Sequence, residues 1–241
     1  MKISRFSFVI VVLILFMAGC ASSGKAALLE RKDPIALVSI ISNKDVNWQG
    51  DAPLDTNNIG PFVRRKLRAE QDLTVVTKMD DLINTAESVL VESLNASRHF
   101  VVADKETVLQ SAAYQNAKER KFPNRVMVAA ENYKFIDYKD KNFLAALALE
   151  TGIQRSMFVE FNITKYVYTG FSLMGNIKAN VEMTVLVLDS RGKTIFRGAN
   201  SVASLGGTKT VSGTYSQSEF AAIIEEALAD VYFAFFEQFE D

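Results

Sequence analysis

Residues 177–187 read IKANVEMTVLV, and this run decides the fold because its side chains alternate between apolar and polar. A period of two is that of a strand with one buried face. Residues 157–164, MFVEFNIT, alternate in the same way. The sequence Asp189-Ser190-Arg191-Gly192 is typical of a hairpin turn and leads into a third strand over 193–202. The sequence therefore predicts an antiparallel meander with one face on a core and the other partly solvated.

Two further segments predict what packs around this meander. Residues 35–41, IALVSII, form a continuous apolar run, which is typical of a strand buried on both faces. Ser216 and Glu219 form a capping-box pattern that opens an amphipathic C-terminal helix. Its apolar side chains recur at three- and four-residue steps: Phe220, Ile223, Ile224, Ala227, Leu228, Val231, Tyr232, Phe235, Phe236 and Phe239. Because its polar side is acidic, we expect this stripe to dock on the sheet rather than on an anionic membrane.

The segment before the meander predicts two helices and a short strand. Residues 99–104 predict the strand, and Asp104 is placed to cap a helix from 105 to about 121. An earlier helix begins at Asp80 or Asp81, with an apolar stripe at Leu82, Ala86, Val89, Leu90 and Leu94. We therefore predict an α/β (α+β-like) fold, with a mixed, largely antiparallel sheet packed against helices and a C-terminal amphipathic helix.

Three other segments complete the prediction. Residues 142–151 predict a compact helix that ends at Gly152. Residues 43–58 predict a loop, and Pro61 is placed to begin a short helix through Arg68. Residues 122–140 show no clear period and predict an irregular insertion. The sequence assigns no role to segments 43–79 and 122–140.

The N-terminus has the order of a bacterial lipoprotein leader. Lys2 and Arg5 precede an apolar run over 6–17, and small residues then lead to Cys20. The run is shorter than the roughly 20 apolar residues that a permanent membrane helix needs. Met17-Ala18-Gly19-Cys20 resembles the lipobox of bacterial lipoproteins, although Met17 replaces the usual leucine.

The lipobox resemblance implies cleavage between Gly19 and Cys20 and acylation of the Cys20 thiol and new amino group, with palmitate among the acyl groups. We therefore predict a signal peptide over 1–19, a tether over 20–33 and one α/β domain over 34–241. An ordinary secretory leader, cut near Ala21, is the competing interpretation. Ala21 in place of aspartate after the cysteine favours the outer membrane under a rule that holds for many Gram-negative lipoproteins.

The order of elements resembles the α/β domain of the TolB amino-terminal and curli-secretion-channel lipoprotein families. The residues that carry the resemblance are 35–41, 92–104 (ESLNASRHFVVAD), 146–163 (ALALETGIQRSMFVEFNI) and 182–198 (EMTVLVLDSRGKTIFRG). The resemblance implies an envelope protein that acts through protein contacts without catalysis. It places no functional residue on this chain except the lipidated cysteine.

Sequence motifs for catalysis or cofactor binding are missing. Gly206-Gly207-Thr208-Lys209 lacks the upstream glycine of a phosphate loop. The chain has one cysteine and one histidine, His99, whereas zinc sites need three or four ligands. Its 27 basic and 28 acidic side chains give a net charge of −1, without the clustered basic face of a nucleic-acid-binding protein. We predict no catalytic residue, cofactor, metal or nucleic-acid partner.

These observations favour a lipid-anchored envelope lipoprotein, facing the periplasm from the outer membrane, with a non-catalytic protein-binding or assembly role. Trp48, in a polar loop, is a candidate contact for an envelope protein partner, or it packs on its own loop. A subunit of an oligomeric outer-membrane secretion channel is the second interpretation, and a hydrolase that uses carboxylates alone is the third. The sequence leaves the partner, the oligomeric state and the leaflet open.

Overall fold

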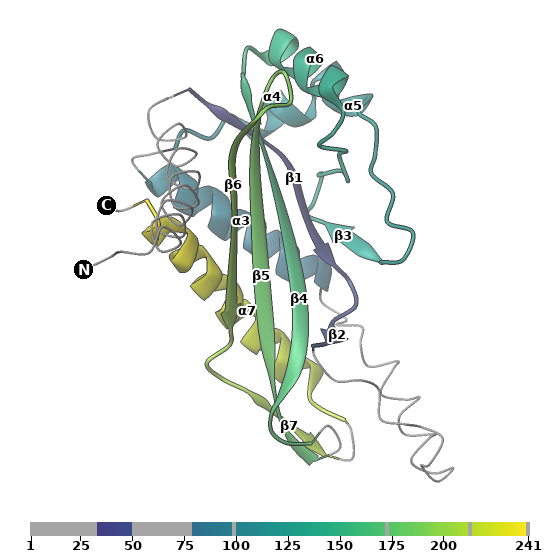
Figure 1. Ribbon diagram of the computed structural model, residues 1–241, viewed down its shortest axis with the longest axis vertical. Coiled ribbons are helices and arrows are strands. Elements are labelled where there is room, and N and C mark those ends of the chain that lie inside the picture. Colours follow the sequence, from purple (N-terminus) through teal and green to yellow (C-terminus); the bar gives the residue numbers. More distant parts are fainter. Residues whose placement is uncertain (1–32, 50–78, 98–99, 172–173, 212–213, 240–241) are drawn as a thin grey trace, which may run out of the picture.

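The computed structural model describes residues 33–49, 79–97, 100–171, 174–211 and 214–239 (Figure 1). In this part of the chain, seven strands form one mixed sheet of order β3-β1-β4-β5-β6, with β2 on β4 and β7 on β5. β1 is parallel to β4, while β4, β5 and β6 are antiparallel. The strands are β1 (Ile35–Asn43), β2 (Asn47–Trp48), β3 (Met127–Ala129), β4 (Arg155–Phe171), β5 (Met174–Asp189), β6 (Thr194–Ala203) and β7 (Thr208–Val211). The predicted α/β class and antiparallel meander are confirmed.

The alternating pattern assigns side chains to faces as predicted. Phe161 and Val185 are buried on one face of the sheet, whereas Glu160 and Thr184 are half-buried on the other. The Asp189 carboxylate accepts the backbone N–H groups of Arg191 and Lys193 at 2.9 and 2.8 Å and fixes the predicted turn between β5 and β6. Every residue of β1 is buried, which confirms the buried strand predicted from 35–41.

Two long helices cover one face of the sheet (Figure 1). The helices are α3 (Met79–Ala96), α4 (Lys105–Leu109), α5 (Ala112–Gln115), α6 (Lys141–Thr151) and α7 (Gln217–Glu237). α7 packs on β5 and β6 and against α3, where the Tyr232 hydroxyl donates to the Ala86 carbonyl at 2.7 Å. Nine of its residues are buried, so the docking predicted for the aromatic stripe is confirmed. No helix among the described residues is both long and apolar enough to span a bilayer.

Of the two bonds of the predicted capping box at the start of the C-terminal helix, only the one to the Ser216 hydroxyl forms. The Ser216 hydroxyl accepts the backbone N–H of Glu219 at 3.3 Å. The Glu219 carboxylate instead accepts the hydroxyl of Thr208 in β7 at 2.6 Å. This side chain therefore ties the start of α7 to the sheet.

Two predictions between residues 99 and 121 are wrong. Instead of a strand, a single parallel bridge joins Val102 to Ile35 in β1, because Asp104, two residues later, already caps α4. The predicted helix from 105 stops at Leu109 because Ser111 caps a separate helix, its hydroxyl accepting the Tyr114 N–H at 3.2 Å. The Asp104 cap itself is confirmed, whereas His99 lies outside the described residues.

The predictions for the other helices and for the insertion are confirmed only in part. The helix predicted over 142–151 is α6, and Gly152 follows it with a φ of 76°. Val89 departs from the apolar stripe of α3, because it remains 38% exposed. The insertion over 122–140 is not wholly irregular, since it contributes β3, which pairs antiparallel with the end of β1. The helix predicted over 61–68 lies outside the described residues.

Candidate binding groove on the open sheet face

The face of the sheet opposite α3 and α7 carries a groove of about 320 Å³. Its floor consists of side chains that the strand alternation turns away from the core, including Glu160 and Asn162 of β4 and Glu182 and Thr184 of β5. The register pairs Glu160 with Thr184 and Asn162 with Glu182, so the four side chains form two neighbouring rows. The Asn162 amide donates to the Glu182 carboxylate at 3.4 Å.

An arginine from the segment before β3 closes one side of the groove. The Arg120 guanidinium forms an ion pair with Glu160 at 3.1 Å. It also lies 4.6 Å from the centre of the Phe122 ring and 5.4 Å from that of Tyr138. Both charged side chains are about a third exposed, so the ion pair contributes at most about 1 kcal/mol. These three contacts fix Arg120 in one orientation and neutralise Glu160.

Two other arginines line the groove without an ion-pair partner among the described residues. Arg125 precedes β3, at one edge of the sheet, and Arg197 lies in β6, at the opposite edge. Both are exposed, and no acidic side chain in the described part of the chain pairs with either. Apolar side chains fill the space between, namely Ile41, Ile136, Phe158 and Leu186. A floor of mixed apolar and polar side chains with arginines beside it is a composition found in protein-binding surfaces.

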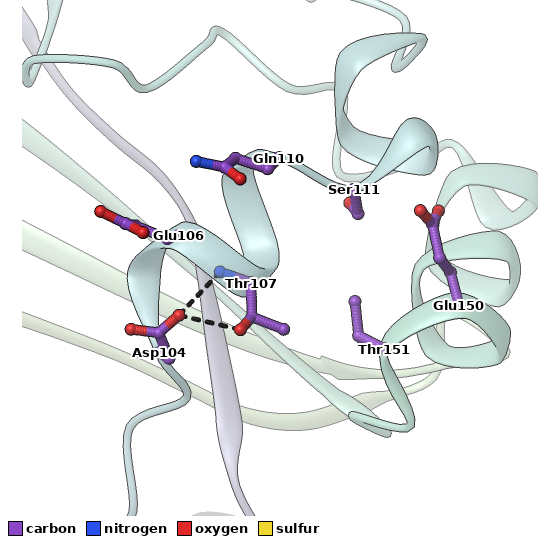
Figure 2. A pocket seen from close by; sticks show the side chains of 7 residues that line it. All are labelled: Asp104, Glu106, Thr107, Gln110, Ser111, Glu150 and Thr151. Atoms are coloured by element: carbon purple, nitrogen blue, oxygen red, sulfur yellow. Dashed lines mark hydrogen bonds between the residues drawn. The ribbon is translucent and has the colours of Figure 1, made fainter.

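A second, acidic pocket lies between α4, α5 and α6. Its volume is about 370 Å³. Figure 2 shows its lining residues, with Asp104 and Glu150 on opposite sides. Asp104 accepts both the backbone N–H and the hydroxyl of Thr107 at 2.8 Å, and the backbone bond above all holds the pKa of Asp104 below its usual range. Glu150 accepts the N–H groups of Ala112 and Ala113 at 2.7 and 2.8 Å. Both carboxylates thus accept backbone N–H groups at a helix N-terminus, Asp104 at that of α4 and Glu150 at that of α5.

The described residues contain no group of three His, Cys, Asp or Glu side chains that could hold a metal ion. Cys20 and Gly19, the predicted lipidation and cleavage residues, lie outside the described residues. Their roles stay predictions.

Trp48 is half-buried in β2, which pairs parallel with β4. Its ring centre lies 4.5 Å from the Lys165 ammonium, which is buried and donates to the Tyr215 hydroxyl at 3.1 Å. Lys165 also lies 5.0 Å from the Tyr215 ring, so it stands between two aromatic side chains. Trp48 therefore packs partly against its own domain, and its role as a partner contact stays a prediction.

The groove was not predicted from the sequence, although part of its signal was present. Glu160 and Glu182 fall on the polar side of the strand alternation, which places them on the solvated face. Arg120 could not be placed there because it falls at the end of the helix predicted from 105 to about 121, and Arg125 could not because it lies in the segment 122–140, which has no period. A polar row on each of two paired strands was the available signal for this site.

Comparison of the sequence with protein families and with curated proteins finds no match. Among solved structures, the LpoB C-terminal domain from Salmonella enterica is 11% identical, covers 75% of this chain and 96% of its own, and has a TM-score of 0.30. The LpoB C-terminal domain from Escherichia coli is 9% identical, with coverages of 76% and 96% and a TM-score of 0.28. The hypothetical protein CT253 from Chlamydia trachomatis is 11% identical, with coverages of 87% and 94% and a TM-score of 0.35.

Proposed function

We propose that this chain is a bacterial envelope lipoprotein that binds a protein partner through the groove and performs no catalysis. Residues 1–19 are removed, acylated Cys20 anchors the protein, and residues 20–33 tether the α/β domain to the outer membrane on its periplasmic side. The leader sequence supports the anchor. The groove on the open sheet face supports the binding role and is the observation that carries it.

The groove suits a protein segment better than a small molecule. It is an open depression across β4 and β5, and its lining changes from the exposed Arg197 on one side to the exposed Arg125 on the other, with apolar side chains between them. Small-molecule sites usually enclose most of their ligand, whereas protein interfaces combine an apolar centre with a charged rim. The partner would cover Leu186, which is only half-buried, and supply hydrogen-bonding groups to Glu182.

Photo-crosslinking in the native envelope tests the binding role. A photoreactive residue at Thr184, on the groove floor, is compared with one at Ala229, which is exposed on the far side of α7. We expect Thr184 to crosslink one protein, which is then purified and shown to bind the wild-type chain but to bind Arg125→Glu/Arg197→Glu at least about tenfold more weakly. No crosslink at Thr184, or the same product from both positions, would contradict the proposal.

Native mass spectrometry of the detergent-extracted protein tests the anchor. We expect an acylated monomer or dimer that begins at Cys20, and a Cys20→Ser variant that carries no acyl chain and leaves the membrane fraction. An unacylated mature chain that begins after Cys20 would refute the lipoprotein assignment. A large acylated ring would instead support the secretion-channel interpretation.

A further inference from the structure

Strand β6 is an edge of the sheet, and its outer backbone groups have no partner among the residues that the structure describes. The Ser204 N–H donates to the Ala179 carbonyl at 2.9 Å, and the β5–β6 register continues from this pair through Ala203 opposite Asn180. Because antiparallel residues alternate between bonded and non-bonded pairs, the N–H and C=O groups of every second residue point away from β5. These residues are Arg197, Ala199, Ser201 and Ala203. No backbone group in the described part of the chain bonds to them.

This edge lacks the usual features that prevent pairing with another chain. Residues 196–203 contain no proline or lysine, and the irregularity in the β5–β6 register lies before Phe196. Three of the four outward residues are alanine or serine, so another backbone could approach closely. The fourth is Arg197, which is exposed and has no acidic partner in the described chain. The edge therefore offers four residues of unpaired backbone and one unpaired positive charge.

We propose that β6 accepts an extended segment of the partner protein by strand addition, and that this segment places an acidic side chain beside Arg197. The inference rests on the proposed binding function and names the chemistry of the partner. Main-chain hydrogen bonds would supply affinity, and alternate side chains would supply specificity. Arg197 also lines the groove, so the added strand would extend the groove floor by one strand.

Charge favours a different protein over a second copy of this chain. The β6 sequence, TIFRGANSVA, contains no aspartate or glutamate. Antiparallel pairing of two β6 strands along their length would therefore leave both arginines without an acidic neighbour. A partner segment with its own carboxylate satisfies Arg197 and the unpaired backbone together.

The test selects peptides from a displayed library of random 12-residue segments against the acylated full-length chain in detergent micelles. Binding of the selected peptides is then measured to matched variants. Ser201→Pro removes an outward N–H and leaves the bonds to β5 in place, whereas Ser201→Ala loses the same hydroxyl contact to Asn180 without blocking the edge. Arg197→Glu reverses the single charge.

We expect selected peptides rich in β-branched residues and in aspartate or glutamate. Ser201→Pro should weaken their binding at least about tenfold, and Ser201→Ala less than about twofold. Selection against Arg197→Glu should yield peptides with lysine or arginine in place of the acid. If Ser201→Pro proves not to fold, as judged by circular dichroism, Ala199→Pro takes its place, because it removes another outward N–H of β6.

Three results would overturn the inference. The first is a selection without binders or without acidic enrichment, and the second is binding that Ser201→Pro leaves unchanged. The third is a dimer of this chain that Ser201→Pro dissociates, because a second copy would then occupy the edge. If the crosslinked partner from Thr184 still binds Ser201→Pro at full strength, the groove function stands while strand addition fails.

Discussion

Phe235 and Phe233 lie two residues apart in α7 and form a matched pair for testing how this helix docks. Phe235 is 1% exposed, and its ring centre lies 6.1 Å from that of Phe196 in β6 and 5.2 Å from those of Phe236 and Phe239. Phe233 is 68% exposed on the outer side of the same helix. Changing either phenylalanine to alanine has the same effect on helix propensity, so the difference between the variants reports burial.

The expected magnitudes differ widely. Phe235→Ala removes a buried ring and leaves a cavity among the edge-on aromatic contacts, which costs about 3–5 kcal/mol in the free energy of unfolding. Phe233→Ala should change that free energy by no more than about 0.5 kcal/mol. At roughly 2–4 °C per kcal/mol for a domain of this size, Phe235→Ala should lower Tm by about 10 °C. Urea unfolding followed by circular dichroism measures both variants.

Equal effects would refute the docking described for α7. A loss below about 1 kcal/mol for Phe235→Ala would mean that its ring is not part of the core. A loss above about 2 kcal/mol for Phe233→Ala would mean that the outer side of the helix is covered in the folded protein. A change in the urea m-value would show that the variant also alters the surface exposed on unfolding.

Three further predictions concern stability. Tyr232→Phe removes the bond to the Ala86 carbonyl between α7 and α3 and should cost about 1 kcal/mol in urea unfolding. Asp140→Ala removes the cap that accepts two N–H groups at the start of α6 and should also cost about 1 kcal/mol, lowering Tm by a few degrees. Burial raises the pKa of Tyr114 from about 10 in the unfolded chain to about 12. Its stabilisation is therefore complete below pH 10 and is lost as pH rises towards 12. The free energy of unfolding should fall over that window, with a smaller slope in Tyr114→Phe, and an unchanged slope would contradict the assignment.

The sequence predicted the elements whose side chains repeat over many residues. β4, β5 and α7 have long periodic patterns. The turn between β5 and β6 was predicted from its own four residues, and the Asp189 carboxylate bonds the backbone there. Short elements were missed because they depend on one local or distant contact. The Ser111 hydroxyl divides the predicted helix after residue 105, and β3 has only three residues, which form a strand because β1 lies beside them.

The groove depends on contacts that no local pattern encodes. Arg120 and Glu160 are 40 residues apart, and their ion pair forms because the segment before β3 folds back over the open face. Strand alternation could place Glu160 on that face but could not bring an arginine to it. Thus the floor of the site was accessible to sequence reasoning, whereas its sides required the tertiary structure.

Under the proposed anchoring at Cys20, the tether and the position of the groove near the start of β4 would set how far from the membrane a partner is held. Ile35, where the described domain begins, pairs with Arg155, the first residue of β4, so the chain enters at one end of a 17-residue strand. At about 3.3 Å per residue, that strand spans roughly 56 Å. The proposed 14-residue tether over 20–33, anchored at Cys20, would reach at most about 49 Å. Glu160 lies five residues along β4, so with this anchor the groove would stay within about 65 Å of the bilayer. Shortening the tether would then bring a bound partner inward by up to about 3.5 Å per deleted residue.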